Sequence, residues 1–287
     1  MIRSKRLEET EKKVEEFILE QESIFEGFQV KESFLWDHSL RVANLAVWLA
    51  SQPPVATHLA KMEVFYLAGL LHDAGKFGVD KEEGDKTTEE KLSATIARTV
   101  LNDIGWSESV VETLCRSFEE LYNDVTTNPV TAILRDADTL SKLGRQGLLT
   151  FVSKWTLRGF PPSVMVRKKL SVELTYAKNA ADTMLTPQGR EAAIEEARWT
   201  RLFFDDLLDQ WRRQGIVDLT TVESEVAGVP IVHVSKPHSQ CGSARWNWTY
   251  ELSKDVKCTK VSVEGTCPSC GRSESQSFCL PMLLKSR

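Results

Sequence analysis

The 287-residue sequence contains no run of 18 consecutive apolar residues, so it predicts no helix that spans a bilayer. Its first 21 residues are charged and amphipathic and lack the apolar core of a secretory signal, which favours a cytoplasmic protein. The formal net charge of −5 argues against a protein that coats nucleic acid or an anionic membrane with its whole surface. What remains is an ordinary globular protein with no membrane partner.

Cysteine is almost absent from the first 240 residues, where Cys115 stands alone, and the other five follow later. In a reducing compartment such cysteines are more often thiols or metal ligands than disulfides. The charge is also uneven, because residues 231–287 carry eight Lys/Arg and four Asp/Glu in an acidic chain. Both features indicate a separate C-terminal module, although a solvated surface of mixed charge explains the second equally well.

The first 215 residues are predicted to be almost entirely helical, because apolar residues recur there at steps of three and four. After Gly215 the pattern changes to alternation, with Trp246, Trp248, Tyr250 and Leu252 on one face of a predicted strand. The expected helices cover residues 5–26, 33–51, 60–74, 88–104, 107–122, 129–144, 145–159, 167–184 and 187–214. The sequence thus predicts a mainly α protein: a helical domain over 1–215, a linker over 216–230 and a small β-rich module over 231–287.

Histidine is scarce, with five residues in the chain, and two of them stand in apolar helical segments that also hold carboxylates. His72 and Asp73 end one such helix, and His38 lies one turn before the core-facing Val42 on another. Asp136 is a charge inside a third apolar helix, and a buried carboxylate is costly unless it is paired or metal-bound. Imidazole and carboxylate together suit divalent ions such as Mn, Fe, Mg, Co, Ni or Zn.

Each of these residues also has an ordinary structural explanation. A single histidine on an apolar helix face is usually a core residue with one hydrogen bond, and a His-Asp dipeptide is common by chance. Asp136 would be satisfied by an ion pair with Arg135 or Arg41. The combination favours a metal site, because His, His-Asp and Asp follow one another on three predicted helices that each have a core-facing stripe.

Three segments, DHSLRVANLA, AGLLHDAGK and ILRDADTLSKLG, resemble the HD superfamily of metal-dependent phosphohydrolases in its HDxGK form. The stretch KLSVELTYAKNAADTMLTPQGREAAIEEARWTRLFFDDLL resembles the helical extension of a bacterial subgroup that carries Asp-Ala-Asp, so the likeness covers about residues 30–212. It implies an HD-type helical bundle with His38, His72, Asp73 and Asp136 as metal ligands. It also implies hydrolysis of a phosphoester or phosphoanhydride in a nucleotide or similar small phosphate.

The same resemblance implies roles for the residues around the ion. Lys76 would face the substrate phosphate and offset its charge. Asp73, or Asp138 as the second acid of the Asp-Ala-Asp element, would accept a proton from the attacking water. Arg41 and Arg145 are further candidates for contacts with the charge of the substrate.

Members of the superfamily that bind two metals usually carry further histidines before the final Asp. This chain has none between His72 and His233, so a single ion is expected. Two other functions stay open from the sequence: a nuclease that uses the C-terminal module to bind a strand, and a non-catalytic ligand-sensing scaffold.

A second candidate metal site lies in the C-terminal module. Cys267 and Cys270 have the CxxC spacing of a zinc knuckle, and the glycine that follows permits a positive φ. His238 and Cys241 repeat that spacing and trailing glycine. We therefore predict a structural zinc with these four ligands, in a module that resembles zinc ribbons. The alternative is a set of thiols without a metal.

The remaining residues of the module leave its role open. In a straight hairpin about the knuckle, Cys258 and Cys279 would face one another about 30 Å from it, too far to share its metal. They would pack as small apolar residues or pair transiently. Trp246, Trp248 and Tyr250, with the nearby lysines and Arg245, would form a face for nucleic acid. The simpler alternative is that these aromatic residues dock the module onto the helical domain.

Overall fold

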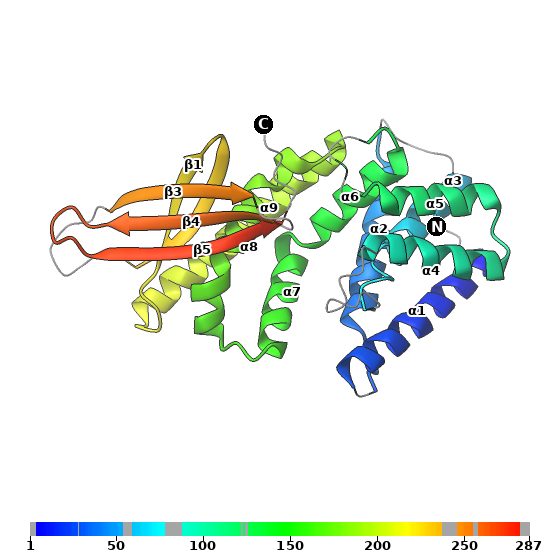
Figure 1. Cartoon of the computed structure of the whole chain (residues 1–287), viewed down its shortest axis with the longest axis horizontal. Helices are drawn as coiled ribbons and strands as arrows, with labels where there is room; N and C mark the ends of the chain where they lie inside the picture. Colours follow the sequence, from blue (N-terminus) through cyan, green and yellow to red (C-terminus); the bar gives the residue numbers. More distant parts are fainter. Residues whose placement is uncertain are drawn as a thin grey trace. The chain divides into compact units, whose positions relative to one another are not determined.

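The computed structural model describes residues 4–27, 29–53, 59–77, 88–121, 123, 126–236, 246–254 and 258–281. In these ranges nine helices precede five strands, which confirms the mainly α fold with a β-rich C-terminal part (Figure 1). None of the helices in the described ranges is both long enough and apolar enough to cross a membrane. The chain divides into two compact units. Unit 1 comprises Met1–Ser141 and Leu185–Gly189, and unit 2 comprises Lys142–Met184 and Arg190–Arg287.

The described residues of unit 1 form six helices, and three of them begin at a capping residue. The side chains of Ser4, Ser33 and Thr88 accept hydrogen bonds from backbone N–H groups in the first turns of α1, α2 and α4. Gly27 ends α1 in the left-handed conformation at φ 74°. The helices are α1 (Lys5–Glu26), α2 (Phe34–Ser51), α3 (Leu59–Leu71), α4 (Glu89–Ile104), α5 (Glu108–Glu119) and α6 (Pro129–Ser141).

The helices α2 and α3 pack with their backbones close together, because Gly69 on α3 has no side chain. A Cβ atom at Gly69 would fall on the backbone of Ala43 in α2. The helix α6 contacts both α2 and α3 and is buried on almost every face. These three helices therefore bring the start of α2, the end of α3 and the middle of α6 into one region of unit 1.

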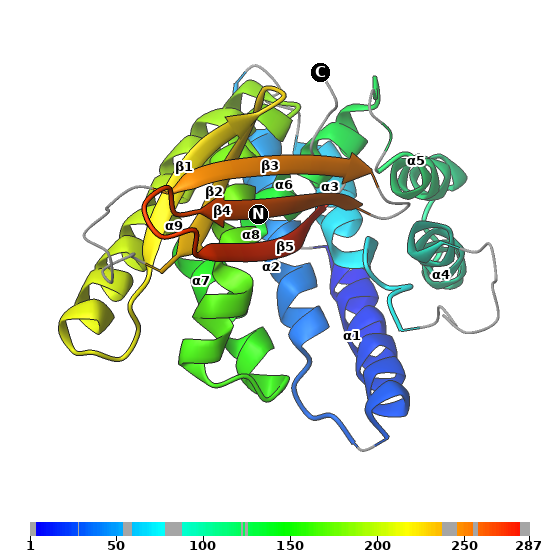
Figure 2. The same ribbon diagram turned by 60° about the vertical axis from the view of Figure 1, so that its left-hand side comes forward.

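Unit 2 combines helices with two antiparallel sheets. The hairpin of β1 (Thr220–Val226) and β2 (Val229–Ser235) forms one sheet, and β3 (Asn247–Lys254), β4 (Cys258–Thr266) and β5 (Ser273–Pro281) form the other. The helices are α7 (Gly144–Leu157), α8 (Pro162–Thr183) and α9 (Pro187–Arg213), the first three residues of α9 being grouped with unit 1. Figure 2 shows α8 beside these strands, and α8 contacts β2 and β5.

Polar side chains at four-residue steps on α8 hydrogen-bond the open edge of β2. Thr175 Oγ1 accepts from the backbone N–H of Val232 at 2.9 Å and donates to the carbonyl of the same residue at 2.7 Å. Ser171 and Asn179, one turn to either side, bond the backbone two residues to either side on β2. Side chains of α8 thus hydrogen-bond backbone N–H and C=O groups at the edge of β2 that would otherwise lack partners.

The predicted domain boundary at 216–230 differs from this division. The strand β1 occupies most of that segment and pairs with β2, with Val222 opposite His233, so the segment is part of a sheet. The unit that contains the strands also contains α7, α8 and most of α9. The physical reason is that α8 supplies both the hydrogen bonds to β2 and the apolar residues, Leu170 and Leu174, of the core it shares with β2.

The aromatic residues of β3 belong to the packing of unit 2. Trp248 and Tyr250 pack against the core formed by Ile231, Val261, Val263, Phe278 and Leu280. Their ring centroids lie 4.6 and 5.7 Å from that of His233, which is fully buried. For these two residues the structure supports the packing alternative over a face that binds nucleic acid.

Candidate metal centre

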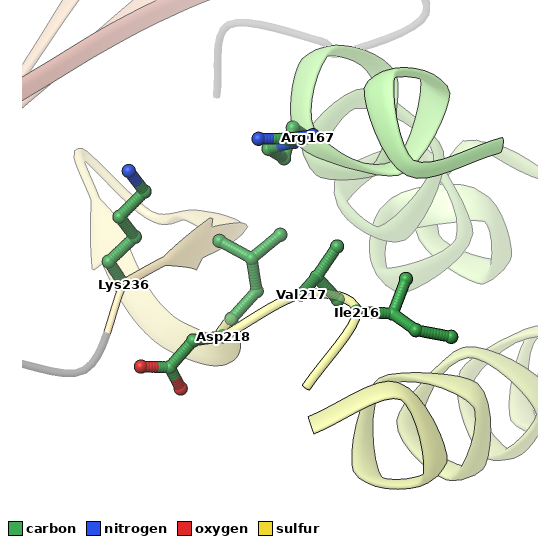
Figure 3. Close-up of a pocket in the computed structure, with 6 residues that line it drawn as sticks. Arg167, Ile216, Val217, Asp218 and Lys236 are labelled. Carbon is green, nitrogen blue, oxygen red and sulfur yellow. The ribbon is translucent and has the colours of Figure 1, made fainter. Parts of the chain in front are cut away.

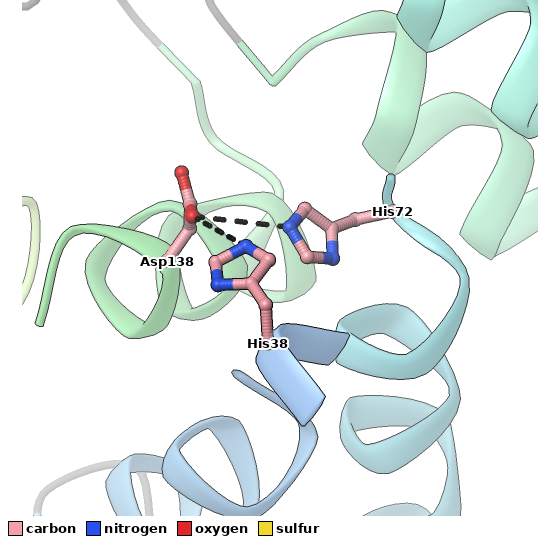
Figure 4. A group of neighbouring side chains, drawn as sticks. All are labelled: His38, His72 and Asp138. Carbon is pink, nitrogen blue, oxygen red and sulfur yellow. Dashed lines mark ion pairs between the residues drawn. The ribbon is translucent and has the colours of Figure 1, made fainter. Parts of the chain in front are cut away.

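His38, His72 and Asp138 converge in unit 1. Each offers one ligand atom, and the three atoms lie within 4.8 Å of one another. Asp138 Oδ1 is 3.4 Å from His38 Nε2 and 3.8 Å from His72 Nε2. Figure 4 shows the two imidazoles, from the start of α2 and the end of α3, turned toward the carboxylate on α6. Three helices therefore supply one compact set of nitrogen and oxygen donors.

Asp73 adds a second carboxylate to the same group. Its oxygens lie 3.5 Å from His38 Nε2 and 3.4 Å from His72 Nε2. On the other side, Asp73 Oδ2 accepts a hydrogen bond from Lys76 Nζ at 2.7 Å. Glu89, the first residue of α4, extends this chain of charges, with Oε1 3.7 Å from Lys76 Nζ. Nothing in the sequence distinguishes Glu89, because an acid in the first turn of a helix is common.

The other nitrogen of each imidazole has a partner that fixes the ring. His72 Nδ1 lies 2.8 Å from the carbonyl oxygen of Gly69, which only accepts, so Nδ1 carries the proton. The hydroxyl of Ser141 donates to the carbonyl of Asp138 and lies 3.4 Å from His38 Nδ1, so it is placed to accept from that nitrogen. Both rings then turn Nε2 toward the carboxylates. Histidines that ligate metals are held in this way.

The electrostatics of the group favour a cation at its centre. Burial lowers the pKa of His72, but Asp73 and Asp138 raise it more, so the net pKa is above its ordinary value. Burial would raise the pKa of Asp73, but His72, Lys76 and His38 together hold it well below its usual range. For His38, burial lowers the pKa despite the nearby carboxylates. Two carboxylates beside the buried imidazole of His72 and the half-buried imidazole of His38 thus make a place where positive charge is stabilised.

The structure does not bring Asp136 into this group. Its carboxylate accepts hydrogen bonds from the backbone N–H groups of Leu185 and Thr186 at 2.8 Å and from Thr186 Oγ1 at 2.6 Å. A Cβ atom at Gly189 would fall on Asp136 Oδ2. Burial raises the pKa of Asp136 although these hydrogen bonds lower it. Asp136 therefore anchors the segment Leu185–Gly189 at the start of α9, and Asp138 rather than the predicted Asp136 lies beside the two histidines.

The other predicted substrate contacts have their own partners. Arg41 lies one turn after His38, with its guanidinium 3.0 Å from Asp37 Oδ2. Arg145 belongs to unit 2, where its guanidinium carbon lies 4.2 Å from the ring centroid of Trp199. Their contacts with a substrate stay predictions.

The candidate zinc ligands are described in part. Cys267 is buried and Cys270 exposed in the turn between β4 and β5, where Gly271 has φ 72° and donates to the carbonyl of Cys267 at 2.9 Å. His238 and Cys241 lie outside the described residues, so the zinc stays a prediction.

The register of β4 and β5 pairs Cys279 with Lys260, two positions from the expected pairing with Cys258. The reason is that the turn between these strands is centred one residue later than the CxxC pair. Cys279 is disulfide-bonded.

A pocket of about 270 Å³ in unit 2 contains none of the predicted site residues. It is lined by Arg167, Ile216, Val217, Asp218, Leu219 and Lys236 (Figure 3). Arg167 Nε donates to the carbonyl of Ser163 on its own helix at 3.1 Å, and the carboxylate of Asp218 points away from the cavity in Figure 3. The catalytic candidates all lie elsewhere in the sequence.

The fold and the site define a helical domain with a candidate metal centre of two histidines and two carboxylates. Residues 35–143 match the family described as the HD domain, and this range contains His38, His72, Asp73 and Asp138. The match confirms the part of the sequence resemblance that concerns this domain. No curated protein matches the sequence.

Solved structures resemble the chain at low sequence identity. YpgQ of Bacillus subtilis is 15% identical with a TM-score of 0.52, over 72% of this chain and 95% of that chain. A predicted HD superfamily hydrolase from an uncultured Thermotogales bacterium is 18% identical with a TM-score of 0.47, over 71% of this chain and 92% of that one. An HD-superfamily hydrolase from Bacillus thuringiensis is 19% identical with a TM-score of 0.47, over 71% and 98%. The likeness to YpgQ shows a shared fold.

Proposed function

We propose that the protein is a metal-dependent phosphohydrolase whose ion is bound by His38, His72, Asp73 and Asp138. The observation that carries the proposal is the convergence of two imidazole nitrogens and a carboxylate oxygen within 4.8 Å, on helices inside a region that matches the HD domain. Among the described residues, no second group of three such donors lies as close together. This supports one ion, as the lack of further histidines predicts.

The residues fit a divalent ion by a test that does not depend on the family. His72 Nε2 is buried and makes no hydrogen bond to any described residue, although it lies among carboxylates. A buried ring nitrogen without a hydrogen-bond partner is costly, and a metal ion satisfies it. The neutral imidazoles and carboxylates match the preferences of Mn, Fe, Co, Ni, Zn or Mg, so the donor set leaves the choice among them to measurement.

The side chains around the ion are assigned different roles in hydrolysis. A divalent ion in this place supplies a Lewis acid for the phosphoryl oxygen and lowers the pKa of the attacking water. Lys76 holds its ammonium group beside Asp73 and offsets negative charge that develops on the phosphate oxygens. The low pKa of Asp73 suits a ligand and makes it a weak proton acceptor. We therefore assign Asp73 to holding the ion.

The substrate in this proposal is a nucleotide or a similar small phosphate. This part comes from the sequence resemblance and is supported by the cations next to the ligands. Lys76 lies beside Asp73, and Arg41 lies one turn from His38 on α2. Both side chains carry the charge that a phosphate requires.

A hydrolysis panel tests the function. Nucleoside mono-, di- and triphosphates are incubated with the full chain and added Mn²⁺, Co²⁺ or Mg²⁺, alongside the His72→Ala and Asp138→Asn variants. We expect release of phosphate or pyrophosphate by the wild type and loss of at least about 100-fold in both variants. If the wild type hydrolyses nothing that these variants fail to hydrolyse, the proposal is wrong.

We also propose a structural zinc bound by His238, Cys241, Cys267 and Cys270. The support is the turn at Gly271, which follows the CxxC pair in the conformation that a knuckle needs. Elemental analysis of protein purified without added metal is expected to show one zinc that the His72→Ala variant keeps and the Cys270→Ser variant loses. Equal zinc in wild type and Cys270→Ser would remove this site from the proposal.

A further inference from the structure

Three phenylalanines of unit 1 either lie close in sequence to the candidate metal centre or contact a residue that does. Phe25 is 65% exposed and Phe34 is 49% exposed, and Phe77 is half-buried. The ring centroids of Phe25 and Phe77 lie 5.2 Å apart with the planes tilted by 40°. Phe25 and Phe77 thus form a pair of rings that keeps apolar area in contact with water, and such area marks binding surfaces. We call Phe25, Phe34 and Phe77 the aromatic platform.

The exposure of Phe25 follows from the geometry of α1. The buried residues of this helix form a stripe that includes Val14, Ile18 and Glu22. Phe25, three residues after Glu22, continues the same face into the last turn, because positions three and four apart lie above one another on a helix. The stripe therefore runs on past the part of α1 that is covered by its neighbours. The ring of Phe77 meets it there.

Two members of the platform lie close in sequence to residues of the metal centre. Phe34 stands four residues before His38 on α2, so the two side chains are neighbours on one helix face, with Cβ atoms about 6 Å apart. Phe77 follows Lys76 directly. The four residues from Asp73 to Phe77 span at most about 15 Å. Figures 1 and 2 both show α1 ending and α2 beginning at the same end of unit 1.

We propose that the aromatic platform stacks the planar base of a nucleoside phosphate whose phosphates lie at Lys76 and the metal centre. The inference rests on the proposed function and narrows its substrate from small phosphates in general to nucleotides. The two ends of the surface match the two ends of that ligand. A cation beside metal ligands suits an anionic phosphate. Exposed aromatic rings suit any of the nucleobases, since every base has a π face.

The test is equilibrium binding of two probes that share one anionic group. Adenosine 5′-(α,β-methylene)diphosphate carries a base, and methylenediphosphonate is the same bridged pair of phosphorus groups without it. Calorimetric titration of the full chain with each probe, in Mg²⁺, measures what the base adds. We expect the nucleotide probe to bind about 5- to 100-fold more tightly, the range that stacking of one base gives.

The variants separate stacking from other causes. Phe25→Ala and Phe77→Ala are expected to lose most of the base-dependent gain while binding methylenediphosphonate as the wild type does. Phe25→Tyr keeps an aromatic face and is expected to keep the gain. Ile24→Ala removes an equally exposed neighbour, 68% exposed, and is expected to change neither affinity. Thermal melting of each variant confirms that it is folded.

Three results would overturn the inference. The wild type binds both probes equally, the alanine variants keep the base-dependent gain, or they lose affinity for both probes in parallel. If instead the alanine variants change only the oligomeric state, the platform is a self-association surface. The hydrolysis panel tests the proposed function separately, because the titration does not require turnover. A protein that shows no His72-dependent hydrolysis but binds the nucleotide probe more tightly would contradict the function and not the platform.

Discussion

Asp136 and Asp138 stand two residues apart on α6 and serve different parts of unit 1. Asp138 Oδ1 lies 3.4 Å from His38 Nε2, whereas Asp136 accepts hydrogen bonds from the backbone N–H groups of Leu185 and Thr186. Residues two apart on a helix point about 200° from one another. One acid thus faces the two histidines and the other holds a distant segment, so we expect the two effects to be separable by mutation.

The variants Asp138→Asn and Asp136→Asn are expected to fail in opposite ways. Asp138→Asn loses bound metal with little change in unfolding free energy. Asp136→Asn keeps metal but loses about 1–3 kcal/mol of stability, because its amide NH₂ replaces one of the two acceptor oxygens and faces a backbone N–H that then lacks an acceptor. Metal content and urea unfolding measure the two effects. Equal loss of metal in both variants would return Asp136 to the ligand set.

Replacing Lys76 with Met is expected to lower kcat about 100-fold or more while leaving the metal content unchanged. The reason is that its ammonium group, 2.7 Å from Asp73 Oδ2, offsets charge on the phosphate rather than holding the ion. Lys76→Arg keeps the charge and serves as the control, with a smaller loss. A Met variant that is inactive because it has lost its ion would contradict this assignment.

The hydroxyl of Thr175 is expected to stabilise unit 2 by about 2 kcal/mol or more. Thr175→Val keeps the shape of the side chain but leaves the buried N–H and carbonyl of Val232 without these partners. Thr175→Ser retains both hydrogen bonds and is expected to lose much less. Chemical unfolding of the three proteins gives the comparison, and equal stability of Val and Ser variants would show that the edge of β2 does not depend on α8.

The sequence was sufficient for the helices because their amphipathic period and caps are local properties. All nine expected helices are present, with ends shifted by a few residues. His38, His72 and Asp73 are also recognisable from the sequence, since each stands in an apolar segment where burial of a polar side chain is costly without a partner. The choice between Asp136 and Asp138 was not accessible, because both acids lie in a helix that is buried on nearly every side.

The sequence pattern does not predict the division into two units, because that division depends on tertiary contacts. Ser171, Thr175 and Asn179 look like ordinary polar positions of a surface helix, and only their four-residue spacing hints at a shared partner. That partner is the backbone of β2, more than 50 residues away in sequence. The segment 216–230 is predicted to be a linker, because the Val and Thr residues of β1 do not by themselves reveal which segment will pair with them.

Burial of His233 makes the stability of the protein depend on pH in a predictable window. Its side chain is fully buried, neither ring nitrogen hydrogen-bonds a described residue, and burial lowers its pKa to about 4. The unfolded chain binds a proton on this residue near pH 6.5, so between pH 6.5 and 4 the unfolded state takes up more protons and stability falls as pH falls. The shift corresponds to about 3 kcal/mol at pH 4.

The variant His233→Phe keeps a ring between Trp248 and Tyr250 and removes the titration. It is therefore expected to lose about 3 kcal/mol less than the wild type between pH 6.5 and 4, while other groups titrate alike in both proteins. Urea unfolding at half-unit pH steps measures the difference. Parallel curves for the two proteins would mean that His233 is protonated in the folded state, and that the core around β2 accommodates its charge.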